Sequence, residues 1–212
     1  MNVFSHESPA YKKIGVENGA YLYSKEIVKY FIPNVDTNRN WVTIRVKPYA
    51  FDHSIVFIHN NVDMNKYDYL EKYHDLILVC GVPATCTKVA HLGKPIYLPL
   101  SVDVKEVEKY KVQRKTKDIC YAGRKGKINS DKVSSFIDRL EDLPHEKLLK
   151  QMAKYKYVYA VGRTAIEAKI LGCQVLPYDD RYPDTSIWSI LDSNDAWHIL
   201  EAQLNKIDGL NL

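Results

Sequence analysis

The chain has 212 residues, of which 46% are hydrophobic, and a formal net charge of +4. This length and composition allow one large domain or two small ones with a real core, and they exclude a chain that is disordered throughout. No apolar run reaches the roughly 18 residues of a membrane span, and residues 1–7 lack the charged and apolar regions of a signal peptide. We therefore expect a cytoplasmic protein, in the host cell if the protein is viral.

Strand and helix patterns alternate along the first half of the chain. Runs rich in β-branched and apolar residues predict strands at residues 2–5, 41–46, 55–58, 76–80 and 96–98. The near-continuous apolar run at 76–80 is typical of a parallel strand covered on both faces. Apolar residues at helical spacing predict helices at 17–31, 67–73 and 85–91.

The second half shows the same alternation. Strands are predicted at residues 117–122, 157–161 and 174–177. Helices are predicted at 130–141 and 145–154, between Gly162 and Gly172, and at 194–206. Alternating strands and helices predict an α/β protein with parallel sheets and right-handed crossovers.

The basic, apolar-poor segment 104–116 is typical of a connector. We therefore predict two Rossmann-like lobes, an N-terminal lobe over residues 1–102 and a C-terminal lobe over residues 103–212. Between residues 109 and 127 the chain has eight basic side chains and one acid, an excess larger than that of the whole chain. Such a run is either a solvated face or the binding surface of an anionic ligand or partner.

The four cysteines predict reduced thiols without a metal site. Cys80, Cys86, Cys120 and Cys173 form no CxxC pair and no pattern with nearby histidines. Three of them lie in or beside apolar strand-like runs, as core cysteines of a cytosolic protein do.

The segment from Val161 to Asp179 carries the clearest chemical signal. Gly162 allows a tight turn, and Arg163 and Thr164 begin a helix whose N–H groups and dipole favour an anion. Glu167 follows one turn later, where it can accept hydrogen bonds from sugar hydroxyls. A phosphate site with a carboxylate one turn away suits a nucleotide sugar.

Three segments, in order, resemble glycosyltransferases of the GT-B architecture. Tyr97-Leu-Pro-Leu-Ser-Val-Asp103 is similar to the hinge that enters the donor lobe. Lys117-Asp-Ile-Cys-Tyr-Ala-Gly-Arg-Lys125 is similar to the first strand and the glycine–basic loop of that lobe. Gly162-Arg-Thr-Ala-Ile-Glu-Ala-Lys-Ile-Leu-Gly-Cys-Gln-Val-Leu-Pro177 is similar to the donor signature, although Tyr159 stands where many members carry a second glutamate.

The resemblance implies two lobes that face a central cleft, with a nucleotide sugar, expected to be a UDP-sugar, on the C-terminal lobe. Arg124 and Lys125, after Gly123, would neutralise the leaving diphosphate, which gives Arg124 a catalytic role. Gly162, Arg163 and Thr164 would support the phosphates or the sugar, and Glu167 would hold the ribose hydroxyls. With cations at the diphosphate, the reaction requires no metal and no further cofactor.

Candidate residues for the acceptor side lie in the first half. His59 and Asp63 follow the predicted strand 55–58, where cleft residues of parallel sheets lie, and either could act as a base. The alternative is a turn that caps the following helix. Lys12, Lys13 and Gly15 form a basic loop that either meets an acceptor phosphate or is solvated.

Several functions are compatible with these features. The first is a glycosyltransferase acting on hydroxymethylated bases in double-stranded DNA, as some bacteriophage enzymes of this architecture do, or on a polysaccharide or teichoic-type acceptor. The second is a protein that binds a nucleotide or nucleotide sugar without catalysis. A nucleotide-dependent oxidoreductase is disfavoured, because no GxGxxG follows the first strand.

Overall fold

The computed structural model describes residues 1–8, 18–44, 50–59 and 64–209. The chain forms two compact units, one of Met1–Pro99 with Ser193–Leu212 and one of Leu100–Asp192. The predicted boundary after residue 102 is close to the passage from the first unit to the second. Residues 193–212, which the sequence analysis assigned to the C-terminal lobe, belong instead to the first unit.

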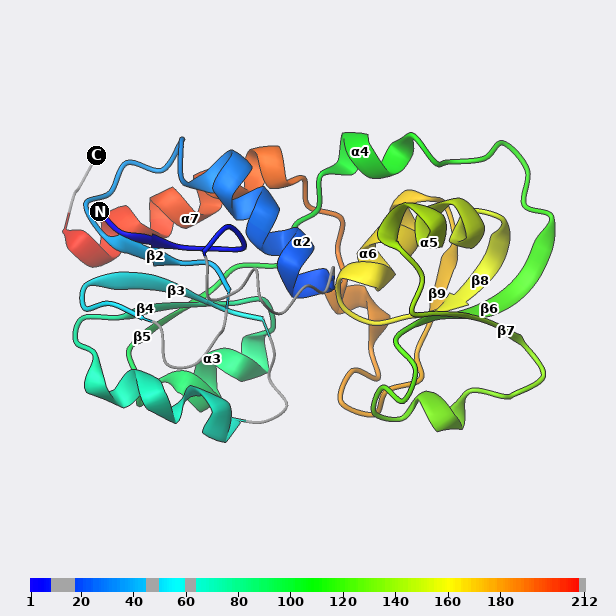
Figure 1. Cartoon of the computed structure of the whole chain (residues 1–212), viewed down its shortest axis with the longest axis horizontal. Helices are drawn as coiled ribbons and strands as arrows, with labels where there is room; N and C mark the ends of the chain where they lie inside the picture. The colour runs from blue at the N-terminus through cyan, green and yellow to red at the C-terminus, as the bar shows by residue number, and fades with distance from the viewer. Residues whose placement is uncertain (9–17, 45–49, 60–63, 210–212) are drawn as a thin grey trace. The chain divides into compact units, whose positions relative to one another are not determined.

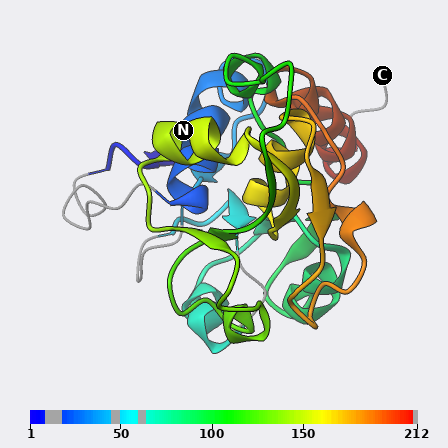
Figure 2. The same cartoon turned by 90° about the vertical axis from the view of Figure 1, so that its right-hand side faces the viewer.

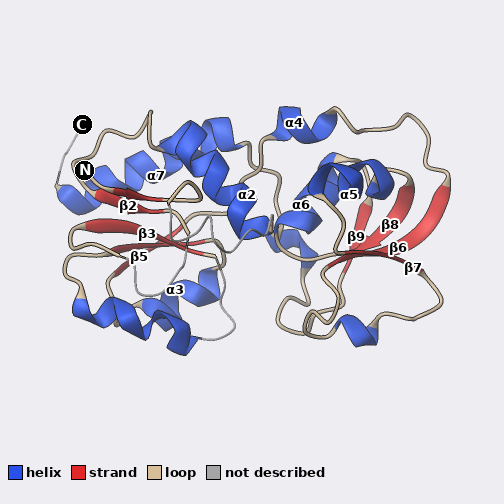
Figure 3. Ribbon diagram, in the orientation of Figure 1, coloured by secondary structure: helices blue, strands red, loops and turns tan. Residues whose placement is uncertain are grey.

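Five parallel strands form the sheet of the first unit, in the order β1-β2-β3-β4-β5 (Figure 3). They are β1 (Val3–Phe4), β2 (Asn40–Val42), β3 (Ser54–Ile58), β4 (Ile77–Cys80) and β5 (Lys94–Tyr97). All residues of β3 and β4 are buried. The apolar runs at 55–58 and 76–80 therefore form central strands covered on both faces, as predicted.

Helices cover both faces of this sheet (Figure 1). They are α2 (Gly19–Glu26), the π-helix η1 (Ile27–Phe31), the 3-10 helix η2 (Met64–Lys72), α3 (Pro83–Val89) and α7 (Ser193–Asp208). On one face, Phe57 of β3 stacks with Trp41 and makes edge-to-face contacts with Tyr23 of α2 and Phe31 of η1. Because successive side chains of a strand point to opposite faces, Val56 and Ile58, on either side of Phe57, point to the other face.

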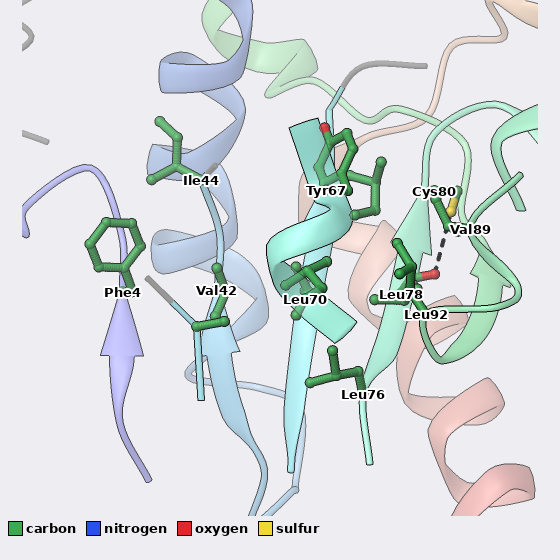
Figure 4. Close-up of a cluster of buried hydrophobic side chains, with 13 residues drawn as sticks. Phe4, Val42, Ile44, Tyr67, Leu70, Leu76, Leu78, Cys80, Val89 and Leu92 are labelled. Atoms are coloured by element: carbon green, nitrogen blue, oxygen red, sulfur yellow. Dashed lines mark hydrogen bonds between the residues drawn. The ribbon is translucent and has the colours of Figure 1, made fainter. Parts of the chain in front are cut away.

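The opposite face is filled by mostly aliphatic side chains, together with Phe4, Tyr67 and Cys80 (Figure 4). Val56 and Ile58 of β3 pack there with Tyr67 and Leu70 of η2 and with Val89 of α3. All five side chains are less than 5% exposed, so this cluster joins β3, η2 and α3. Burial of such apolar area is the main source of stability for the unit.

A buried arginine joins α7 to the rest of the first unit. Arg39 is 3% exposed, and its Nη2 lies 2.6 Å from Asp208 Oδ1 on α7. Its Nη1 lies 3.1 Å from Asp75 Oδ2, just before β4. The guanidinium therefore ties the last helix to a sheet formed by residues far away in the sequence, which explains why α7 belongs to this unit.

Four parallel strands form the sheet of the second unit, in the order β7-β6-β8-β9. They are β6 (Lys117–Gly123), β7 (Asp138–Glu141), β8 (Tyr155–Tyr159) and β9 (Gln174–Leu176). The helices are α4 (Val104–Glu108), α5 (His145–Met152), α6 (Arg163–Ile170) and the 3-10 helices η3 (Ser130–Lys132) and η4 (Thr185–Ile187). α5 and α6 pack together on one face of the sheet (Figure 1, Figure 2).

The predicted helix at residues 130–141 is wrong. Only Ser130–Lys132 is helical there, as the short η3, and residues 138–141 form β7, which pairs with β6. The apolar residues of the segment have helical spacing, but Phe136 is 98% exposed, so they do not form one buried face. Strand pairing along β6 overrides the local pattern.

The predicted connector at residues 104–116 is also wrong. This segment lies within the second unit and begins with α4, whose cap Asp103 accepts a hydrogen bond from the Glu106 N–H. Val107 is 1% exposed, and α4 packs against α6. Of the basic residues that follow, Lys115 donates to the Ala153 carbonyl oxygen and Lys117 pairs with Asp138, both within the unit.

The protein is thus an α/β protein with two parallel sheets, consistent with two Rossmann-like lobes. The GT-B arrangement of these lobes stays a prediction. In the described part of the chain, no helix is long and apolar enough to span a membrane. All four cysteines are free thiols, and Cys80, Cys120 and Cys173 are buried, as predicted.

The contacts of Arg39 give a first prediction. Arg39→Met should lower the free energy of unfolding by about 1.5–3 kcal/mol at pH 7, since hydrogen bonds to charged partners are lost. The hydrogen bond from Arg39 lowers the pKa of Asp208, so this stability is present above the unfolded value of about 3.9 and is lost as the pH falls through the lower folded value. Urea denaturation at several pH values measures both effects. The free energy of unfolding of Arg39→Lys should lie between those of wild type and R39M. Equal stability of wild type and R39M at pH 7 would contradict the role.

Candidate functional site

The strand order of the second sheet reverses once. From β6 the chain moves outward to β7, then returns across β6 to β8 and continues to β9. In open parallel sheets, ligands bind outside the carboxyl ends of the strands at such a reversal, because the loops that leave the neighbouring strands diverge and open a crevice. Among the described strands, the first sheet shows no reversal, since β1 to β5 follow one another in order. Topology therefore favours the second unit.

We use the name carboxyl edge for the segments that follow the four strands of the second sheet, residues 123–129, 142–145, 160–167 and 177–181. Gly123, Arg124 and Lys125, the predicted diphosphate contacts, lie at the end of β6 and in the loop after it. The predicted donor residues of the other motif, Gly162, Arg163, Thr164 and Glu167, lie at the start of α6, directly after β8. The fold thus brings both motifs to one edge, as parallel strands require.

The loop after β6 is tightly built. A side chain at Gly123 would place a Cβ 2.6 Å from the hydroxyl oxygen of Tyr121, so any other residue there would require the buried tyrosine ring to move. The same hydroxyl donates a hydrogen bond of 3.1 Å to the carbonyl oxygen of Arg124. Gly126 and Asn129 have positive φ values of 65° and 62°, which turn the chain back on itself. The loop therefore holds its basic residues at the end of β6.

A buried carboxylate joins the loop after β6 to the loop after β9. Asp179 is 1% exposed and accepts hydrogen bonds from Arg181 Nε at 2.8 Å and from Asn129 Nδ2 at 3.3 Å. Burial alone would raise the pKa of Asp179, but the hydrogen bonds from Arg181 lower it below its ordinary value. Asp179 is therefore ionised at neutral pH and holds Arg181 beside the loop of residues 124–129.

Lys127 lies among cations. Burial, the charge of Arg124 and the charge of Arg181 together lower the pKa of the Lys127 ammonium to about 8, against the opposing charge of Asp179. The side chain is half-buried, so bulk water screens these charges only in part. An anion bound beside Lys127 would remove this unfavourable interaction.

Three other lysines of the basic run 109–127 have structural partners. Lys109 pairs with Glu106 on α4, and Lys117 pairs with Asp138 at 2.9 Å. Lys115 donates to the carbonyl oxygens of two residues at helix ends, at 2.7 and 2.8 Å. The basic residues of the run therefore do not form one continuous charged surface.

Three basic residues of the run, Arg124, Lys125 and Lys127, lie at the carboxyl edge, while the exposed Lys111 and Arg114 lie before β6. In the part of the chain that the structure describes, no carboxylate forms an ion pair with Arg124, Lys125 or Lys127. Arg124 and Lys125 are exposed, and the Lys125 N–H donates to Asp142 in the loop after β7 at 3.3 Å. These three cations are available to a ligand.

A second buried carboxylate stands at the start of α6. Glu167 is 1% exposed, and its Oε1 accepts a hydrogen bond of 2.7 Å from Arg163 Nε and one of 2.9 Å from His145 Nε2. Burial alone would raise the pKa of Glu167, but the charge of Arg163 and the bond from His145 lower it. The carboxylate is thus ionised and joins α6 to the first residue of α5.

These contacts bear on the ribose role of Glu167. Its Oε1 is already used by two donors, so at most Oε2 is left for sugar hydroxyls. Gly162, which precedes the helix, has φ 63° and ψ −140°, a conformation that other residues rarely adopt. The glycine therefore has the turn role expected of it, while the ribose contact stays a prediction.

The candidate residues of the first unit are only partly described. His59 Nε2 lies 2.5 Å from the carbonyl oxygen of Thr43, and the Tyr23 ring lies edge-on to its imidazole. Because a carbonyl only accepts, Nε2 must donate in this bond, and a base at His59 would have to act through Nδ1. Asp63, Lys12, Lys13 and Gly15 lie outside the described residues.

Sequence reasoning missed His145 and the special position of Lys127. His145 has no convergent partner in the sequence, and the helix predicted at 130–141 hid the strand before it. Had residues 138–141 been assigned as a strand, His145 would have been placed at the helix start after it, on the same edge as Gly123 and Gly162. The influence of Arg181 on Lys127 had no signal in the sequence, since β9 and its loop lie far along the chain.

The arrangement can bind a ligand with several negative charges and stabilise negative charge that develops on it. α5 and α6 both start at this edge without a side-chain cap, so their helix dipoles add to the positive potential. Among the described residues, no group of three or more histidines, cysteines or carboxylates is placed to hold a metal ion.

The environment of Lys127 gives a second prediction. Lys127→Met should raise the free energy of unfolding at pH 7 by roughly 1–3 kcal/mol, since each pKa unit corresponds to about 1.4 kcal/mol. Below pH 8 Lys127 is charged in both the folded and the unfolded state, so the full free-energy cost of its charge in the folded protein is present. Between pH 8 and 10.5 the unfolded state binds more protons, so the stability of wild type should rise and approach that of the variant. Denaturant titrations test this, with Lys156→Met as control, because Lys156 is exposed and pairs only loosely with Asp118. A K127M protein less stable than wild type would contradict the prediction.

Comparisons with protein-family models, with curated proteins and with solved structures found no match. The function is therefore inferred from the geometry of the carboxyl edge together with the sequence resemblance.

Proposed function

We propose that the protein binds a nucleotide diphosphate sugar at the carboxyl edge of the second unit and transfers the sugar to an acceptor hydroxyl. The observation that carries this proposal is that Asp179 binds both Arg181 and Asn129, and so joins the loop after β9 to the loop that carries Arg124 and the half-buried Lys127. Like charges held together in a partly dry site are stabilised by an anion that binds between them.

The charge of the site suits a diphosphate better than a single carboxylate. Arg181 forms an ion pair with Asp179, but in the described part of the chain no carboxylate forms an ion pair with Arg124, Lys125 or Lys127. The uncapped starts of α5 and α6 add positive potential at the same edge. A diphosphate would therefore meet three cations and two helix starts.

The same cations suit the chemistry of glycosyl transfer. When the bond between a sugar and a diphosphate breaks, negative charge develops on the diphosphate. Cations already held in place stabilise that charge without reorganisation in the transition state. The three segments that resemble GT-B glycosyltransferases support this choice of reaction, because two of them, at Gly123–Lys125 and Gly162–Glu167, supply residues of the carboxyl edge.

A second candidate is a protein that binds the nucleotide sugar without transferring it. The contact of His59 with the Thr43 carbonyl favours this candidate, because one nitrogen of the predicted base is engaged in a backbone hydrogen bond. The two candidates share the donor site and differ in turnover. Measurements of binding and of turnover on the same protein therefore separate them.

Binding of UDP provides the third prediction. Calorimetry should show that Lys127→Met weakens UDP binding by about 1–3 kcal/mol, since a charge-assisted interaction is lost, while Lys156→Met leaves it unchanged. Because UDP should raise the pKa of Lys127 from about 8, binding at pH 8 should take up about half a proton in wild type and none in K127M. Titrations in buffers of different ionisation enthalpy measure this uptake. Equal affinities of K127M and wild type would reject the site.

Turnover decides between the two candidates. Wild type is incubated with UDP-glucose, UDP-galactose and GDP-mannose, each with hydroxymethylated double-stranded DNA, with a polysaccharide acceptor, or with water alone, and the released nucleotide is measured. We expect release with at least one nucleotide sugar and a lower kcat for Arg124→Ala, because the charge of the leaving group is greatest in the transition state. Tight binding without any release would support the second candidate.

A further inference from the structure

We propose that His145 is the catalytic base of the transfer, which takes the proton of the attacking hydroxyl, and that Glu167 is the positioning residue that orients it. This inference rests on the proposed function. His145 is the first residue of α5, and its Nε2 lies 2.9 Å from Glu167 Oε1 at the start of α6. Both helices start at the carboxyl edge, where Arg124, Lys127 and Arg181 converge.

The hydrogen bond to Glu167 determines which ring nitrogen of His145 is basic. An ionised carboxylate can only accept, so Nε2 must carry the hydrogen. In the neutral ring the lone pair is then on Nδ1, which can take a proton. Glu167 thus fixes both the tautomer and the orientation of the imidazole, the arrangement found where a carboxylate holds a histidine base.

The exposure of the two side chains suits these roles. The Glu167 side chain is 2% exposed and that of His145 is 19% exposed, so the carboxylate is shielded while the imidazole can be reached. Arg163 Nε binds the same Oε1 at 2.7 Å and keeps the buried carboxylate ionised. When Nδ1 takes a proton, the imidazolium faces an acid in a site of low polarity, where their attraction is strong.

The other charged groups near α5 have partners of their own. On the strands packed against α5, oppositely charged side chains form three pairs: Lys117 with Asp138, Lys156 with Asp118, and Arg139 with Glu141. On α5 itself, Glu146 pairs with Lys150, and before it Asp142 accepts from the Lys125 N–H. Burial raises the pKa values of Cys120, Tyr121 and Tyr155 on the same strands, so these groups stay neutral. In the described part of the chain, Glu167 is thus the acid in contact with His145.

His145 has a contact that suits a base better than the contact of His59. The structure gives His59 a hydrogen bond to the Thr43 carbonyl, which carries no full charge. A carboxylate stabilises the imidazolium that forms during proton transfer much more than a carbonyl does. The two histidines are therefore competing candidates that one set of variants can separate.

The proposed step is balanced without a further reactant. Nδ1 of His145 takes the hydroxyl proton while the hydroxyl oxygen forms a bond to the anomeric carbon of the sugar. The bond from this carbon to the phosphate oxygen breaks, and its electron pair leaves with the diphosphate, which the cations of the carboxyl edge stabilise. The imidazolium then releases its proton to water. When water itself is the attacking hydroxyl, the same step is hydrolysis of the nucleotide sugar.

The fourth prediction compares His145→Gln with His59→Gln, using the turnover panel described above. Glutamine at 145 keeps a donor for Glu167 but has no base, so kcat should fall by about 10²–10⁴-fold. KM and UDP affinity should stay within about twofold, and the loss of activity on the acid side of the wild-type pH profile should disappear. His198→Gln, on the exposed surface of α7, is the control and should match wild type.

The outcomes separate this inference from the proposed function. An active wild type with an equally active H145Q would overturn the role of His145 alone, and a large loss of kcat in H59Q instead would assign the base to His59. A wild type that turns over no nucleotide sugar of the panel would overturn both proposals. A higher KM in H145Q with unchanged kcat would make His145 a binding residue and reject its role as base.

The role of Glu167 has a readout of its own. Long-range proton–nitrogen NMR correlations of the His145 ring should show the hydrogen fixed on Nε2 in wild type and a mixture of tautomers in Glu167→Gln, with UDP affinity unchanged. If Glu167 holds a pentose instead, E167Q should weaken UDP binding and leave the tautomer as it is, which would overturn the positioning role. Should the buried E167Q fail to fold, the tautomer of wild-type His145 still tests the assignment, because a hydrogen on Nδ1 alone is incompatible with it.

Discussion

The candidate site depends on the order of four parallel strands with a single reversal around β6. In a parallel sheet every strand ends at the same edge, so segments far apart in sequence must meet there. The reversal sends the connection after β6 and the helix after β8 to different sides, and this separates the loops that follow the two strands. The glycine–basic loop and the start of α6 are the segments that follow these strands. No other described part of the chain combines this topology with unpaired cations.

Two buried carboxylates hold this edge together in the same way. Asp179 binds Arg181 and also Asn129 of the loop after β6, while Glu167 binds Arg163 and also His145 of α5. Each acid is neutralised by an arginine on its own segment and takes a further hydrogen bond from a segment that follows another strand. Burying a charge requires such partners. The result is a rigid edge on which the basic residues of the loop after β6 have no acid to pair with.

This division between paired and unpaired charge is what connects the fold to the proposed chemistry. The lysines that stabilise the second unit are those with carbonyl or carboxylate partners, such as Lys115 and Lys117. Lys127 forms no ion pair in the described part of the chain, and burial, with the charge of Arg124, lowers its pKa to about 8. The proposed base lies on the same unit as these cations. The groups proposed to stabilise a leaving diphosphate and the group proposed to accept the proton are therefore held by one sheet.

The sequence by itself determined the α/β class, most strands and helices, and the positions of the two glycine motifs, because these features depend on local periodicity and on glycines where the chain turns. It did not determine the strand at 138–141, since the apolar spacing there is helical and only pairing with β6 makes it a strand. It also did not determine that α7 packs in the first unit, which depends on Arg39 and its contact with Asp208. The neighbours of Lys127 and the bond between His145 and Glu167 were decided by tertiary structure alone, because the electrostatic environment of a side chain depends on distances in space, and folding sets these distances between residues that the sequence keeps far apart.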